Sequence, residues 1–142
     1  MKKTVIILVS FVIAAALIAI YVIINKNNYD KANPDDALAY NNMGIAYDNK
    51  GNYDEAIACY KKAIKLNPDF VMAYGNLGIA YYSKGNYDKA IACYEKAIEL
   101  NPDFADAYYN MGTAYQYSGK KDKANECFQK ANMIKNRGTN KK

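Results

Sequence analysis

Apolar residues recur at intervals of three and four along most of this chain, the spacing that places them on one face of an α-helix. Between residues 37 and 70 the pattern forms two segments, which are separated by Lys50-Gly51-Asn52 and closed by Asn67-Pro68-Asp69. Gly and Pro interrupt helices, because Gly is conformationally free and Pro has no backbone N–H to donate. The pattern therefore predicts a helical hairpin, two helices joined by a short turn.

This hairpin pattern occurs three times in the sequence. Residues 37–70 align without a gap on residues 71–104, a period of 34, and residues 105–138 form a third, looser copy. A fixed period of this length is typical of stacked repeats, in which each unit packs only on its neighbours. The Asn-Pro-Asp tripeptide recurs at Pro34 and Pro102, where we expect Pro either to end one helix or to lie in the first turn of the next.

Large and small apolar residues keep fixed positions in each copy. The positions in the first copy are Tyr40, Met43, Gly44, Tyr47, Ala56, Tyr60, Ala63 and Pro68. Those in the second are Tyr74, Leu77, Gly78, Tyr81, Ala90, Tyr94, Ala97 and Pro102. Those in the third are Tyr108, Met111, Gly112, Tyr115, Ala124, Phe128 and Ala131. This pattern resembles the tetratricopeptide repeat, which implies an all-α fold, an α-solenoid of three helix-turn-helix hairpins packed through these side chains.

A different pattern precedes the repeats. After the short basic N-terminus at residues 1–3, residues 4–24 contain no charge. As a helix this segment would span about 31 Å at ~1.5 Å per residue, which matches a hydrocarbon core of roughly 30 Å. We therefore expect one transmembrane signal-anchor helix, followed at residues 25–36 by a tether and helix cap. The alternative is a cleaved signal peptide, although the apolar run is longer than is usual for one.

The charges that flank residues 4–24 bear on orientation. Lys2, Lys3 and the amino group precede the segment, and Lys26 and Lys31 follow it. The small excess on the N-terminal side favours a single-pass topology with a cytoplasmic N-terminus, which would place the repeats on the other side of the membrane.

The third copy has a polar version of one apolar row. Asn125 and Asn132 stand where the first two copies have isoleucine, at positions 57, 64, 91 and 98. Because a stack of repeats needs a polar outer face, we expect the array to end here. Residues 118–142, which include the basic tail 139–142, carry 8 basic and 2 acidic residues, a net charge of +6. Such charge is typical of a solvated last helix, and the alternative is a patch for anionic lipid or an acidic partner. Nucleic acid is not expected, because no reading motif accompanies the charge.

Candidate chemistry is scarce. The sequence contains no histidine, the commonest general base and metal ligand. The three cysteines, Cys59, Cys93 and Cys127, are one position copied at intervals of 34, so we interpret them as packing residues. We predict no catalytic residue, no metal, no cofactor and no enzymatic activity.

The resemblance implies a concave face, built from the first helix of each hairpin, that binds extended or helical peptides. The candidate groove residues are Asn42, Asn76, Tyr82, Tyr109, Asn110, Gln116 and Tyr117. The three asparagines stand one repeat apart, and their amides could bind a peptide backbone or could instead complete bonds between helices. Relatives that bind chaperone tails carry basic residues in a row that is here Asn41, Gly75 and Tyr109, which disfavours a C-terminal EEVD-like ligand.

The sequence thus predicts a membrane-anchored adaptor with a protein or peptide partner of unknown identity. Two alternatives stay open: an exported soluble module after signal cleavage, and a structural scaffold that self-associates end to end.

Overall fold

The computed structural model describes residues 16–20 and 34–139 of the 142-residue chain. Residues 16–20 are helical and belong to a unit, Met1–Ala32, that is separate from the unit Asn33–Lys142. Within the described ranges no helix has the length and apolar character needed to cross a membrane. The predicted transmembrane helix at residues 4–24 lies mostly outside these ranges, as does most of the tether, so both stay predictions.

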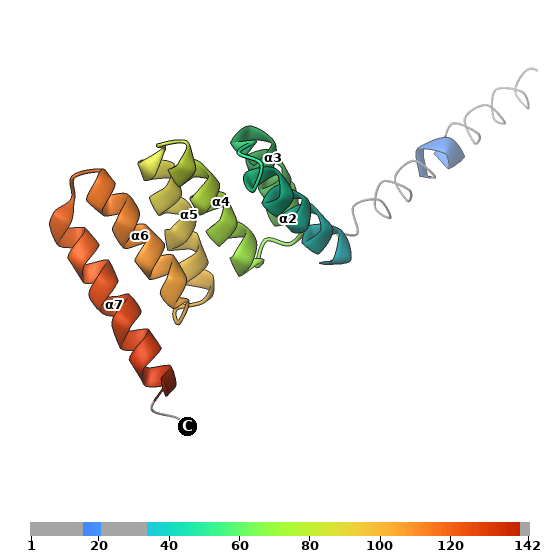
Figure 1. Ribbon diagram of the computed structural model, residues 1–142. Helices are drawn as coiled ribbons and strands as arrows, with labels where there is room; N and C mark the ends of the chain where they lie inside the picture. Colours follow the sequence, from blue (N-terminus) through green and yellow to red (C-terminus); the bar gives the residue numbers. More distant parts are fainter. Residues whose placement is uncertain (1–15, 21–33, 140–142) are drawn as a thin grey trace, which may run out of the picture. The chain divides into compact units, whose positions relative to one another are not determined.

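The second unit confirms the predicted all-α repeat solenoid (Figure 1). Each hairpin consists of a first and a second helix. The first hairpin is α2 (Pro34–Asp48) and α3 (Tyr53–Leu66), the second is α4 (Val71–Ser83) and α5 (Tyr87–Leu100), and the third is α6 (Ala105–Tyr117) and α7 (Lys121–Thr139).

The turn inside each hairpin requires glycine. Gly51, Gly85 and Gly119 have φ angles of 78°, 74° and 81°, a left-handed conformation that side chains with a Cβ rarely adopt. In the first turn the backbone N–H of Asn52 donates to the Tyr47 carbonyl at 3.0 Å, and the other two turns repeat this bond. The three hairpins therefore reverse direction in the same way.

The prolines occupy both kinds of position expected from the sequence, the first turn of a helix and the segment that follows one. Pro34 is the first residue of α2, whereas Pro68 and Pro102 lie in the loops between hairpins. In the first of these loops the Asn67 side-chain oxygen accepts a hydrogen bond from the Asp69 backbone N–H at 3.1 Å. Asn101 repeats the interaction in the second loop. The asparagine side chain thus helps to form the turn after α3 and after α5.

The two helices of each hairpin approach closely where the first helix carries glycine. A Cβ added at Gly44 would lie 2.5 Å from the Tyr60 ring, and one at Gly78 would lie 2.5 Å from the Tyr94 ring. Gly112 faces Phe128 in the same way. Tyr60 and Tyr94 are the largest fully buried side chains of the described unit. The glycine thus makes room for a large ring between the helices, and this space offsets its cost of about 1 kcal/mol within a helix.

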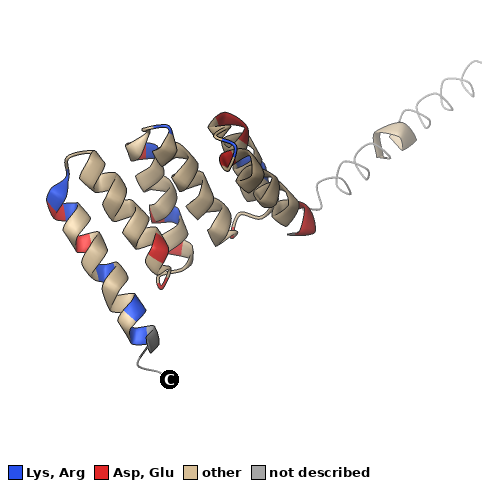
Figure 2. Cartoon of the chain, in the orientation of Figure 1, with Lys and Arg blue, Asp and Glu red and all other residues tan. Residues whose placement is uncertain are grey.

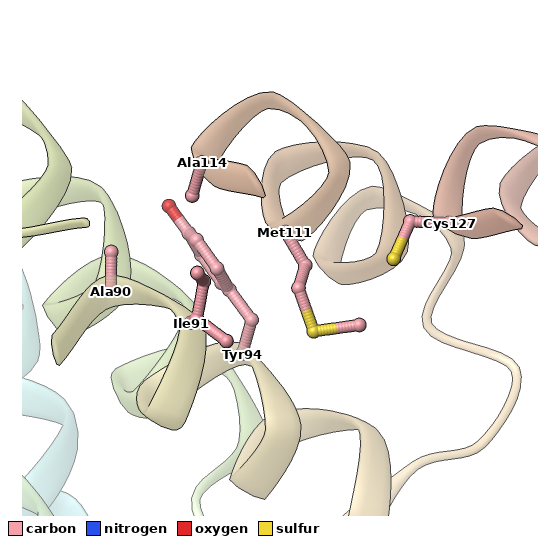
Figure 3. Close-up of a cluster of buried hydrophobic side chains, with 6 residues drawn as sticks. All are labelled: Ala90, Ile91, Tyr94, Met111, Ala114 and Cys127. Atoms are coloured by element: carbon pink, nitrogen blue, oxygen red, sulfur yellow. The ribbon is translucent and has the colours of Figure 1, made fainter. Parts of the chain in front are cut away.

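Neighbouring hairpins pack the second helix of one against the first helix of the next. Ala56, Ile57 and Tyr60 of α3 form a buried cluster with Leu77 and Ala80 of α4. The next junction repeats this cluster with the residues drawn in Figure 3, which are Ala90, Ile91, Tyr94, Met111, Ala114 and Cys127. Of the other predicted packing residues, Ala124 is buried, and those that are partly buried are Tyr40, Tyr47, Tyr74, Tyr81, Tyr108, Tyr115 and Phe128.

The stack curves towards its first helices. Helix α4 contacts both α2 and α6, whereas no contact joins the second helices α3, α5 and α7 to one another in the described unit. The first helices therefore lie on the inner side of the curve. This is the side on which the sequence placed the candidate groove.

The last helix is longer than its counterparts. Helix α7 has 19 residues, against 14 in α3 and in α5. In its final turns Lys135 pairs with Asp106 at 3.2 Å and Arg137 with Asp103 at 3.5 Å. Figure 2 shows blue segments along α7 and red segments at the loop before α6. Part of the predicted basic charge is therefore paired within the fold.

Candidate functional site: a groove across α4 and α6

The inner surface is hollowed between the second and third hairpins. One cavity of about 300 Å³ is lined by Ile79, Tyr82, Ser83, Tyr94, Asn110 and Thr113. A second, of about 260 Å³, is lined by Met72, Gly75, Asn76, Ile79, Phe104, Asp106, Ala107 and Asn110. Because Ile79 and Asn110 line both, the two cavities form one groove along α4 and α6, which we call the central groove.

The smaller cavity of the central groove lies where α4 carries no side chain, at Gly75. A Cβ placed on Gly75 would lie 3.3 Å from the Phe104 ring, so even alanine would make close contact there. The equivalent residue of the first hairpin is Asn41, whose side chain is buried. One repeat later, the absence of a side chain opens the floor of the groove to Phe104.

The asparagine row has different roles in different hairpins. The Asn76 amide donates a hydrogen bond of 3.0 Å to the Asn41 side-chain oxygen, which ties α4 to α2. Asn110 faces Gly75 instead and has no equivalent acceptor, and within residues 34–139 no hydrogen bond engages its side chain. Asn42, at the outer end of the row, is exposed. Asn76 is therefore partly structural, while the Asn110 amide faces the groove.

Three tyrosines form one wall beside the larger cavity. The ring centroids of Tyr82 lie 5.5 Å from Tyr87 and 5.7 Å from Tyr117, and the second pair is edge-to-face. Burial raises the pKa of Tyr82, and the neighbouring Tyr117 hydroxyl raises it further. The Tyr117 side chain is 63% exposed. The wall therefore offers the hydroxyl of Tyr82 and the accessible ring of Tyr117 to a bound chain.

The remaining predicted groove residues lie towards the last helix. The Tyr109 ring packs on Phe128 at 5.4 Å, with the Lys135 ammonium 5.9 Å from its centroid. Gln116 lines a separate cavity of about 290 Å³ with Lys121 and Phe128 of the third hairpin. The structure thus groups Asn76, Tyr82, Asn110 and Tyr117 around the central groove, and it places Tyr109 and Gln116 at its terminal side.

The electrostatics of this surface are mildly acidic. No lysine or arginine is among the described residues that line the central groove. Asp106 lines it but is paired with Lys135. In the first hairpin one carboxylate oxygen of Asp48 is buried without a hydrogen-bond partner, and burial raises the pKa of this carboxyl. The described lining of the central groove therefore carries no positive charge.

The structure gives the cysteines no reactive setting. All three are free, and Cys59 and Cys127 are buried. Burial raises the pKa of each thiol, that of Cys93 to about 11, so each is protonated at neutral pH. Across the part of the chain that the structure describes, no cluster of three or more Cys, Asp or Glu residues could hold a metal ion.

Sequence reasoning missed the apolar floor of the groove. Met72 and Ile79 were not distinguished from core residues, yet they are 51% and 37% exposed and line the cavities. A signal was available, because the third copy has Asp106 and Thr113 at these two positions. A position that is polar in one copy is a candidate surface position, because polar residues are mostly exposed. Gly75 and Phe104 gave no such signal, since their proximity depends on the packing of successive hairpins.

Comparison with known protein families identifies the repeat. The description "Tetratricopeptide repeat" matches residues 37–70, 59–92 and 105–135, and "TPR repeat" matches residues 78–119. The hairpins are tetratricopeptide repeats. Comparison with curated proteins gives no match.

Solved tetratricopeptide repeat structures share the fold. A crystal structure of MamA has a TM-score of 0.72 and 36% identity, and the match covers 76% of this chain and 63% of that one. The chain therefore spans less than two thirds of that MamA chain. The second and first repeat domains of Spaghetti (RPAP3), each bound to the HSP90 peptide SRMEEVD, both have TM-scores of 0.70, with 25% and 26% identity. These matches cover 73% and 72% of this chain, and 96% and 81% of those chains.

Proposed function

We propose that the three repeats form an adaptor that binds a segment of a protein partner in the central groove, and that the protein has no catalytic role. The observation that carries the proposal is the pair of cavities that share Ile79 and Asn110. Their apolar lining and convergent amides are typical of sites that fix a peptide by a few buried side chains and backbone hydrogen bonds. The Spaghetti repeat domains, which hold a peptide on the same fold, give the proposal independent support.

The lining of the groove indicates the chemistry of the ligand. Met72, Ile79 and the Tyr82–Tyr117 wall suit aliphatic or aromatic anchor side chains. The Asn110 amide can bond a peptide carbonyl and N–H group at once. Because no Lys or Arg is among the described residues that line the cavities, a neutral or mildly basic segment fits better than an acidic tail.

The test is a selection of phage-displayed random peptides on the full chain, kept in a mild detergent. We expect enriched peptides with aromatic or aliphatic anchors and few acidic residues. Binding should weaken on Tyr117→Ala, and the peptide SRMEEVD, used as the acidic control, should not compete. Peptides that ignore groove substitutions but are lost when Lys141 and Lys142 are replaced would refute the proposal and assign binding to the basic tail.

The adaptor is further proposed to be held at a membrane by residues 4–24, on the strength of their length and lack of charge. The proposed topology places the N-terminus in the cytoplasm and the repeats on the opposite side. After a carbonate wash the full chain should stay with the membrane fraction, and its first residue should still be Met1. A mature N-terminus between residues 16 and 31 would instead establish an exported, processed protein.

A further inference from the structure

The first helix of the stack has an apolar face that its counterparts bury. In α4 the residues Ala73, Leu77 and Ala80 are buried, and in α6 the equivalent Ala107, Met111 and Ala114 are buried. In α2 the same positions hold Ala39, Met43 and Ala46, and all three are exposed, Met43 by 46%. We call these three residues of α2 the end face. It is distinct from the central groove, which runs along α4 and α6.

The chain itself shows twice what covers such a face. Against α4 lie Ala56, Ile57 and Tyr60 of α3, and against α6 lie Ala90, Ile91 and Tyr94 of α5. In both junctions the covering element is an amphipathic helix that presents small, β-branched and aromatic residues in the order Ala-Ile-x-x-Tyr. The end face of α2 has the same small–large–small form and therefore fits the same kind of helix.

Charge adds a second requirement. Asp54 of the first hairpin pairs with Lys84, which follows α4, and Asp88 of the second pairs with Lys120, which follows α6. Each acid lies two residues before the buried alanine of its helix. Lys50 is the counterpart of Lys84 beside the end face, and within residues 34–139 no carboxylate pairs with it. A covering helix with an acid at that position would complete the junction.

From these observations we infer that the end face is a second docking surface, which takes an amphipathic helix of a partner protein with the pattern Asp-x-Ala-Ile-x-x-Tyr. The docked helix would extend the stack by one helix at its first end. The inference concerns a surface separate from the groove and does not depend on the proposed peptide site.

The residues that precede α2 do not carry this pattern. When Pro34 is aligned with Pro68 and Pro102, Lys26 stands where Tyr60 and Tyr94 stand. Asp30 likewise stands in the position of Ile64 and Ile98. A charged residue at the position of the buried ring would be costly to bury, so the sequence directly upstream is a poor occupant.

A second copy docked head to tail is also a poor occupant. The last helix has Asp122, Ala124 and Phe128 at the right spacing, but Asn125 replaces the isoleucine of the pattern. Asn132 replaces the second isoleucine of the helix, and both asparagines are exposed. Burying two amides against Ala39, Met43 and Ala46 would leave them without hydrogen-bond partners.

The experiment uses α3 as a probe in trans. A peptide of residues 53–66, with Cys59→Ala, is stapled between the exposed positions 58 and 62, because a free helix of this length is marginal. It is titrated into the full chain in detergent, labelled on its methionine methyl groups. We expect the Met43 signal to shift while that of Met72, which reports the central groove, stays in place.

Variants sharpen the result. Ala46→Lys should weaken binding about tenfold or more, as loss of an interface anchor does. Asn42→Lys, at an exposed position of the same helix outside the end face, should not. A peptide with Asp54→Lys should bind more weakly, and Lys50→Asp in the protein should restore it.

Three outcomes overturn the inference. The first is a shift at Met72 without one at Met43, which would place the peptide in the groove. The second is the absence of any shift at millimolar peptide. The third is concentration-dependent self-association that Ala46→Lys abolishes, which would assign the end face to a second copy of this chain.

Discussion

Helix α4 meets the first hairpin on one side and the third on the other, and the two junctions can be compared residue by residue. Their buried sides are nearly the same, since Ala56, Ile57 and Tyr60 correspond to Ala90, Ile91 and Tyr94. Their inner sides differ. At the first junction an Asn41–Asn76 hydrogen bond closes the surface, whereas at the second Gly75 and Asn110 leave it open to two cavities.

The difference between the two inner sides distinguishes the positions that are the same in both junctions from the positions that vary. Residues between hairpins are held by packing, where a change of volume is costly. On the inner side the first copy has Asn41 where the second has Gly75, while both junctions keep the same buried residues. If the central groove binds a peptide as proposed, its specificity depends on the positions at which the copies differ.

The largest expected effect tests whether the two cores are equivalent. Tyr60→Ala and Tyr94→Ala should each lower the free energy of unfolding by about 3–5 kcal/mol, the usual cost of truncating a buried aromatic ring. Urea denaturation of the full chain, followed by circular dichroism, measures both. Tyr→Phe at each position serves as the control and should cost far less, because Phe128 fills this position in the third hairpin. Costs that differ by more than about 2 kcal/mol would show that the cores are not interchangeable.

The next effect concerns the aromatic wall of the second junction. Tyr117→Ala should weaken binding of a groove-selected peptide by about 1–3 kcal/mol, because the exposed ring is a rigid contact surface. Tyr109→Ala should cost less, since that ring packs on Phe128 at the terminal side. Titration calorimetry gives the affinities, and unchanged helicity is the control. Equal losses at both positions would place the ligand across the third hairpin instead.

A smaller effect comes from making the second junction resemble the first. Gly75→Asn should fill the groove floor and give the Asn110 amide an acceptor, which should weaken peptide binding about tenfold, or roughly 1.4 kcal/mol. Asn41→Gly is the matched variant at the first junction and should leave this binding intact. If Gly75→Asn binds as tightly as the native chain, the cavity beside Phe104 is not where the ligand anchors.

The smallest effect lies at Asp48, which corresponds to Tyr82 of the second junction. Its pKa is raised by burial, so its charged form is disfavoured in the folded state. Asp48→Asn should therefore raise stability at neutral pH, by less than about 0.5 kcal/mol because the group keeps contact with solvent. The gain should vanish below about pH 4, where the carboxyl is protonated in both states. Thermal melts at several pH values test this, and a gain independent of pH would show that the charge is not the cause.

The 34-residue period of the sequence was enough to predict most of the fold. It located the three hairpins, because the same apolar spacing and the same Gly turn recur. The inner surface was harder to predict, since α4 has apolar residues on several faces and spacing alone cannot say which face is covered. The sequence therefore did not predict that Met72 and Ile79 line the groove. It did predict Tyr109 as a groove residue, but the Tyr109 ring packs on Phe128. Such outcomes depend on the curvature of the stack and on which helix has a neighbour.

The sequential order of the contacts also has a kinetic consequence. Every contact between helices of the described unit joins elements that are adjacent or next-but-one in the chain, so the first and third hairpins never meet. Folding then closes only short loops and should be fast for a chain of this length. For the same reason, unfolding can proceed one hairpin at a time. Amide exchange should spread inward from α2, while α4 and α5, which have a hairpin on either side, should open last.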